Sequence, residues 1–126
     1  MSEHGEQSLV IAWANRHAEE YPVLRWLYSS LNGIFIPAPM HIRAKIINHM
    51  KAEGMKKGVA DLCLPMARHG FHGLYIEMKR NDGGVLSKEQ KEFLAFLEQQ
   101  GYYGAVCNGY NEAVDVLEWY IKGDKP

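Results

Sequence analysis

The sequence predicts an α/β fold in which a small mixed sheet is flanked by helices. The first observation behind this prediction is a set of short apolar runs bounded by Gly or Pro, as strands are: Ile34–Ile36, Gly58–Leu64, Gly73–Lys79 and Tyr103–Cys107. The second is that longer segments with apolar residues at helical spacing lie before, between and after these runs. The predicted core order is therefore α-β-β-β-α-β, followed by a last helix.

The first half of the chain contains two predicted helices and one predicted strand. Residues Glu6–Ala18 carry an apolar stripe at helical spacing, which Tyr21–Pro22 brings to an end. Val23–Ser30 is interpreted as a short helical turn. After the Asn32–Gly33 turn comes the strand Ile34–Ile36, and a second helix is expected over His41–Glu53.

The second half is predicted to hold a hairpin, a crossover helix, a strand and a helix. The two hairpin strands are joined by the loop Met66–His72, and Ser87 opens a helix that runs to about Gln100. Ser87 and Gln90 fit a capping box, in which each side chain binds a free backbone amide. The strand Tyr103–Cys107 then follows the crossover, which implies parallel pairing, and Asn111 is expected to cap the final helix.

Composition favours one compact intracellular domain, residues 1–126. The chain has 126 residues, is 47% hydrophobic and carries a formal net charge of −1, so no overall basic charge favours nucleic acid. Two cysteines make no disulfide framework and are expected as free thiols. The N-terminus lacks the order of a signal peptide, and no apolar run is long enough to span a membrane. We therefore expect a soluble, cytoplasmic protein.

The most informative stretch is the hairpin, because charged residues interrupt its apolar strands. With a period of two, the simplest register sets Asp61 across from Glu77, and Lys79 shares the face of Glu77. Two opposed carboxylates repel each other, and a cation between them reverses that cost. Hard cations such as Mg²⁺ take carboxylate, carbonyl and water ligands, so the Met78 carbonyl is a further candidate ligand. Glu6 is a third acid that can approach from the first helix.

The same residues also suit simpler roles. Glu77 or Asp61 can pair with Lys79 in a surface salt bridge, and Glu6 can be an acid favoured by a helix N-terminus. What distinguishes the metal hypothesis is that inward-facing charges in apolar strands need partners or a metal. In that case the site suits phosphodiester hydrolysis, with Lys79 orienting the attacking water or assisting as a base.

Basic residues gather just before Asp61. Between Arg43 and Lys57 the balance of charges is +4, from Arg43, Lys45, Lys51, Lys56 and Lys57 against one Glu. Such a cluster is either a solvated helix face or a contact to DNA phosphates. We list Arg43, Lys45, Lys56, Lys57 and Arg80 as candidate DNA-binding residues. His69 and His72, without further ligands at suitable spacing, are expected in a solvated loop or at a phosphate rather than on a transition metal.

Five sequence features together resemble the VRR-NUC domain, the virus-type replication–repair nucleases of the PD-(D/E)XK superfamily. They are Glu6–Gln7, Gly58–Asp61, Gly73–Lys79, Ser87-x-x-Gln90 and Gly101–Tyr102. The resemblance implies a restriction-endonuclease-like fold with Asp61, Glu77 and Glu6 as Mg²⁺ or Mn²⁺ ligands, Lys79 positioning water and Gln90 as an accessory residue. The proline that the family usually has before the metal aspartate is Ala60 here. Glu3 is an alternative to Glu6, which we prefer because Glu3 lies near a chain end that tends to fray.

The resemblance also implies a substrate and an assembly. Small stand-alone members of the family, including phage-encoded ones, are similar to dimeric, structure-selective endonucleases that act on branched DNA such as Holliday junctions. We therefore expect a homodimer and a DNA partner by analogy. The rival interpretation is a non-catalytic DNA-binding or assembly module that keeps the nuclease fold.

Overall fold

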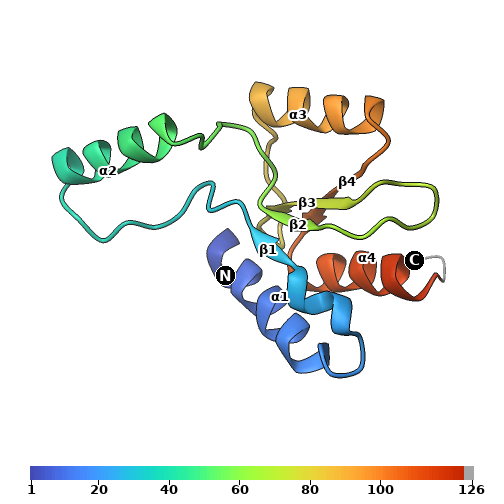
Figure 1. The fold of residues 1–126 in the computed structure, drawn as a ribbon. Helices are drawn as coiled ribbons and strands as arrows, with labels where there is room; N and C mark the ends of the chain where they lie inside the picture. The colour runs from blue at the N-terminus through green and yellow to red at the C-terminus, as the bar shows by residue number, and fades with distance from the viewer. Residues whose placement is uncertain (124–126) are drawn as a thin grey trace.

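The computed structural model describes residues 1–123, so the last three residues of the expected domain lie outside the described residues. It contains four α-helices, a short 3₁₀ helix and a four-stranded mixed sheet (Figure 1). In chain order the elements are α1 (Glu3–His17), η1 (Pro22–Trp26), β1 (Tyr28–Ser29), α2 (Met40–Ala52), β2 (Leu62–Leu64), β3 (Leu74–Lys79), α3 (Lys88–Gln99), β4 (Tyr103–Asn108) and α4 (Tyr110–Lys122). The predicted α/β class with its helix-flanked mixed sheet is confirmed.

The sheet has the order β1-β2-β3-β4, and β3 is one of its two central strands. β2 pairs antiparallel with both β1 and β3, whereas β3 and β4 run parallel. The parallel pair is joined by α3, as the predicted crossover requires. α3 covers one face of the sheet, and α1 and α4 cover the other (Figure 1).

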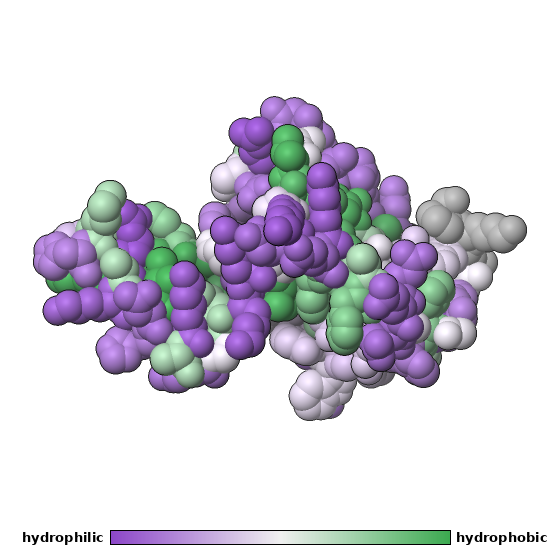
Figure 2. Space-filling model, turned by 90° about the horizontal axis from the view of Figure 1, so that it is seen from above, coloured by the Kyte–Doolittle hydropathy of each residue, from purple (hydrophilic) through white to green (hydrophobic). Residues whose placement is uncertain are grey.

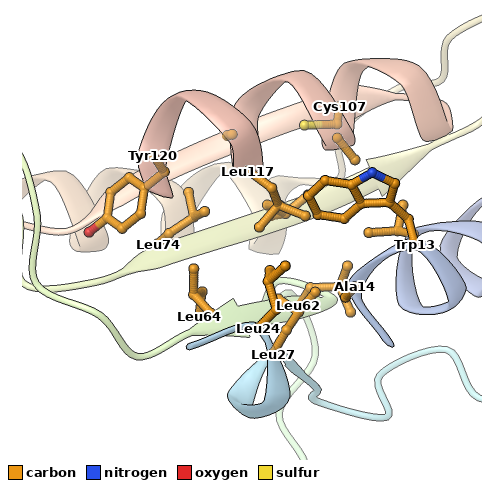
Figure 3. Packing of buried hydrophobic residues seen from close by; sticks show 14 of the residues in the cluster. Trp13, Ala14, Leu24, Leu27, Leu62, Leu64, Leu74, Cys107, Leu117 and Tyr120 are labelled. Carbon is orange, nitrogen blue, oxygen red and sulfur yellow. The ribbon is translucent and has the colours of Figure 1, made fainter. Parts of the chain in front are cut away.

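The hydrophobic core lies between the sheet and the pair α1 and α4 (Figure 3). Because side chains alternate between faces, the even-numbered residues of β2 and β3 point into it, as do Ala105 and Cys107 of β4. Leu62, Leu74 and Met78 are each at most 1% exposed, and Leu117 of α4 packs there fully buried. The odd-numbered residues of β3, including Glu77 and Lys79, therefore face α3.

The helical turn predicted over Val23–Ser30 is confirmed in its first half by η1, whereas its end and the predicted strand Ile34–Ile36 are wrong. The first strand is Tyr28–Ser29, inside the segment predicted as a helical turn, and it pairs with Cys63 and Leu62 of β2. The predicted strand Ile34–Ile36 is a loop, because no neighbouring strand reaches it among the described residues. Phe35 there is 69% exposed.

Two helix starts also differ from prediction. α1 begins at Glu3 rather than Glu6, because the Ser2 hydroxyl accepts a hydrogen bond from the Gly5 amide at 3.1 Å and caps the helix. α4 begins at Tyr110, one residue before the expected cap Asn111. Its first amide is bound by a side chain from elsewhere in the fold, as described below.

The second helix, α2, stands apart from the rest of the molecule as an arm. Two linkers, residues 30–39 and 53–60, carry it away from the sheet (Figure 1). Within the described part of the chain it has no buried residue and makes no extended contact with another helix or strand. Figure 2 shows it as a separate lobe with hydrophobic side chains on its surface; Ile42 and Ile46 are 42% and 38% exposed.

No helix among residues 1–123 combines the length and the apolar character needed to cross a membrane.

Candidate functional site

A cavity of about 290 Å³ opens where the end of β3 meets the first turns of α1 and α3. The candidate residues Asp61, Glu77 and Gln90 line it, together with Glu3 and residues that the sequence analysis did not single out as site residues. The full lining is Glu3, His4, Gln7, Asn32, Gly33, Lys57, Gly58, Val59, Asp61, Glu77, Ser87 and Gln90. The described structure thus gathers segments that lie up to 87 residues apart in the chain.

The two hairpin acids meet as the sequence predicts. The pairing of Leu62 with Ile76 places Asp61 at the next position, opposite Glu77. The carboxylate of Asp61 accepts a hydrogen bond from the Met78 amide at 2.8 Å, which holds it at the end of the strand. The role of the Met78 carbonyl as a metal ligand stays a prediction.

Glu77 is the electrostatic centre of the cavity. Its side chain is 3% exposed, and burial raises its pKa to about 9, helped by the hydrogen bond and the charge of Asp61 and opposed by the charge of Lys79. Without a cation, Glu77 therefore carries a proton at neutral pH. The ionised form of such a buried acid, facing a second acid, is stable only when a cation lies beside it.

Gln90 links the neighbouring groups into one network. Its backbone and side chain form the predicted capping box with Ser87. The same side chain accepts a hydrogen bond from the Lys79 ammonium at 3.1 Å and donates one to the Glu77 carboxyl at 3.3 Å. Lys79, only 6% exposed, is therefore held beside Glu77. The helix start of α3 thus positions the two charged residues of β3.

On the first helix, the structure places Glu3 rather than Glu6 at the cavity. The carboxylate of Glu3 lies 3.9 Å from the Lys79 ammonium and is 47% exposed. Glu6 is buried, at 8% exposed, and accepts a hydrogen bond from the Tyr110 amide at the start of α4. That amide is an unpaired donor at the positive end of a helix, so it holds the Glu6 carboxylate away from the cavity. The structure therefore places Glu3, the alternative, at the cavity and Glu6 elsewhere, and which of the two binds a metal stays a prediction.

The basic residues proposed to contact DNA separate into three groups. Lys57 lines the cavity, with its ammonium 3.5 Å from the Glu89 carboxylate of α3. Arg43 and Lys45 lie on the α2 arm, and Lys56 lies in the linker that returns from it. Arg80 follows β3 and pairs with Asp82 at 3.6 Å. The structure therefore brings Lys57 to the acids and leaves Arg43 and Lys45 on the arm.

The donor set of the cavity suits a hard cation that keeps most of its waters. No group of three or more His, Cys, Asp or Glu side chains in residues 1–123 forms a ready-made metal cage. Mg²⁺ is usually bound by one or two carboxylates plus waters and substrate phosphates, and Asp61 with Glu77 supplies such a pair. Burial, and after it the hydrogen bond and charge of Asp61, raise the pKa of Glu77, and a cation between the two acids would favour the ionised form.

Comparison with known proteins gives one family. The model of the VRR-NUC domain matches residues 1–111. A solved structure described as a VRR_NUC domain protein superposes with a TM-score of 0.76 at 26% sequence identity, covering 99% of this chain and 92% of that chain. No curated protein matches the sequence.

Proposed function

This chain belongs to the VRR-NUC domain family, a family of nucleases, and we propose that it hydrolyses DNA phosphodiester bonds with Mg²⁺, or Mn²⁺ in its place. The observation that carries the proposal is the buried Glu77 opposite the half-buried Asp61, at a cavity beside Lys79 and Gln90. A bound divalent cation would lower the pKa of a water and stabilise charge on the phosphate.

Each residue of the cavity has a separate part in the proposed reaction. The carboxylates of Asp61 and Glu77 would hold the cation from the hairpin, and that of Glu3 would approach it from the start of α1. Lys79 holds the attacking water and offsets phosphate charge. Gln90 keeps the Lys79 ammonium in place, because its side-chain oxygen accepts from it at 3.1 Å. The products are 5′-phosphate and 3′-hydroxyl ends.

The rival function is a non-catalytic DNA-binding or assembly module with the same fold. The two buried groups disfavour it, because a site without catalytic work has no reason to keep Glu77 and Lys79 out of water beside a second acid. Glu77 and Lys79 are 3% and 6% exposed, and removing such groups from water costs free energy of folding. A catalytic role for both groups explains why the protein bears that cost.

We also propose that the protein acts as a homodimer joined through the α2 arm. Large exposed apolar side chains concentrate on the arm and its approach: Trp26, Tyr28, Leu31, Ile34, Phe35, Met40, Ile42 and Ile46. A half-exposed side chain of this size offers on the order of 100 Å², so together they approach the ~800 Å² per partner of a standard interface. A short helix without tertiary packing is marginal in water, and a second copy would cover it.

A dimer suits a branched substrate. Two copies would present two cavities related by a two-fold axis, and a four-way junction needs two paired nicks. Arg43 and Lys45 border the side of α2 that carries Ile42 and Ile46, one at each edge, so the arm can bind DNA phosphates beside its covered apolar side. We therefore propose junctions and other branched DNA as the preferred substrates.

The test of catalysis is a panel of linear, flap and four-way DNA substrates with Mg²⁺, Mn²⁺ or chelator. We expect cleavage that needs the metal, and we expect Lys79→Ala to abolish it while binding to the same DNA survives. Lys88→Ala is the matched control, because that lysine is exposed on α3 and its one ion pair within residues 1–123 is with Glu92, at 3.9 Å. Wild-type protein that binds junctions but never cuts them with either metal would leave the non-catalytic module as the function.

The test of the dimer is sedimentation of the free protein. Charges placed in the apolar side, as in the double variant Ile42→Glu and Ile46→Glu, are expected to convert dimer to monomer. Asn48→Glu places a charge on the other side of α2 and should leave the dimer intact. A wild-type protein that sediments as a monomer at all concentrations refutes this assembly.

A further inference from the structure

The base of the α2 arm is closed by one side chain, that of Asn32. Its amide nitrogen donates hydrogen bonds to the Lys56 carbonyl at 2.7 Å and to the Val59 carbonyl at 2.9 Å. Both N–H donors of the side chain are thus used on the linker that returns from the arm. The two carbonyls bracket Lys57 and Gly58, which line the cavity.

Asn32 is itself held by the turn in which it lies. Its backbone amide donates to the Ser30 hydroxyl at 3.2 Å, and the Ser30 amide donates to the Asp61 carbonyl at 2.9 Å. Leu31 between them takes a φ of 62°, a left-handed conformation that is strained for a bulky residue. The turn therefore ties the return linker to the backbone of Asp61.

The other side of the return linker is pressed against α3. A Cβ atom added at Gly58 would lie 2.6 Å from the carbonyl of Glu89, so the backbones are in close contact. Lys57 bridges the same junction through its ion pair with Glu89. The residue after Glu89 is Gln90, whose side chain holds Lys79 and Glu77. Residues 56–59 are thus a wall, fixed by Asn32 on one side and by α3 on the other.

We propose that Asn32 is a positioning residue of the cavity: it fixes the wall of residues 56–59 and so holds Asp61 and Lys57 in register with the α3 network. Its effect on catalysis rests on the nuclease function proposed above. The placement of the wall does not depend on that function, because it follows from the hydrogen bonds alone. Because a misplacement of about 1 Å can cost on the order of 10²-fold in rate, a loosened wall lowers turnover.

The test compares Asn32→Leu, which has a similar size and no donors, with Asn111→Leu, an exposed substitution on α4. Three measurements are made: kcat and KM for junction cleavage, amide hydrogen exchange, and the midpoint of thermal unfolding. We expect Asn32→Leu to lower kcat about tenfold or more with a smaller change in KM. Exchange should rise in residues 54–60 and stay slow in β3, and the midpoint should match that of Asn111→Leu.

Two results overturn the proposal. One is unchanged exchange in residues 54–60 or unchanged kcat. The other is exchange that rises in β3 as much as in the wall, because a general loss of stability would then explain the loss of rate. If the wild-type protein cleaves no substrate, the proposed function fails, and the exchange measurement alone decides whether Asn32 holds the wall.

Discussion

Replacing Glu77 by Gln should make the metal-free protein more stable, although it removes a residue of the proposed catalytic site. In the folded protein the pKa of Glu77 is raised from 4.5 to about 9, chiefly by burial and then by Asp61. Glutamine has the shape of the protonated acid and no charge to bury. It keeps an acceptor for Gln90 and offers the Asp61 carboxylate an N–H in place of the acid proton.

The size of the effect follows from the linkage between proton binding and folding. Where the folded protein holds a proton that the unfolded chain has lost, wild-type stability falls with rising pH by up to about 1.4 kcal/mol per pH unit. This fall begins near the unfolded pKa of 4.5 and ends as pH passes the folded pKa of about 9. At pH 7 the full cost is roughly 3 kcal/mol, and relaxation of the site reduces it. The gain from Glu77→Gln should therefore be about 1–3 kcal/mol at pH 7 and less than about 1 kcal/mol near pH 5.

The assay is chemical denaturation in chelator at pH 5 and pH 8, comparing the free energy of unfolding of wild type and Glu77→Gln. Glu98→Gln, at an exposed position on α3, controls for the loss of one negative charge. A Glu77→Gln variant that is no more stable than wild type at pH 8 refutes the inference that Glu77 is buried protonated. A gain of the same size at both pH values refutes the linkage argument as well.

The remaining predictions concern the cation, the first helix and the wall of the cavity. Metal uptake at neutral pH should release about one proton, because Glu77 must lose it; titration calorimetry in two buffers with different heats of ionisation measures this. Glu3→Gln should lower cleavage about tenfold or more without changing the free energy of unfolding, whereas Glu6→Gln should cost about 1–3 kcal/mol of stability, because the Tyr110 amide loses a charged acceptor. Gly58→Ala should lower the unfolding midpoint and the rate of cleavage together, because at a φ of 92° its Cβ meets the α3 backbone.

The part of the site that could be predicted from sequence depends on local periodicity. Side chains alternate along a strand, so a hairpin of known loop length fixes which residues face each other. That is why the pairing of Asp61 with Glu77 and the shared face of Lys79 could be derived from spacing. The capping box at Ser87 and Gln90 is equally local. Gln90 is also at helical spacing from the apolar residues of α3, which is why its side chain could be predicted to face the sheet.

The part that could not be predicted depends on contacts between distant segments. β1 is a strand only because two residues find partners on β2, and nothing in Tyr28–Ser29 itself distinguishes it from the turn before it. Asn32 was recognised as a turn residue, yet its side chain acts on carbonyls 24 and 27 residues further along. The spacing of Ile42 and Ile46 indicated a helix correctly, but not that this helix leaves the body of the molecule.

The choice between Glu3 and Glu6 shows why burial alone does not identify a metal ligand. Glu6 and Glu77 are both buried acids, and both were assigned to the cation from sequence. Glu6 faces the free amide that begins α4, a partner that fully satisfies a carboxylate. Glu77 is buried facing another acid, and burial first and Asp61 second raise its pKa. A buried carboxylate therefore points to a cation when the group across from it is also negative, and this holds for Glu77 and not for Glu6.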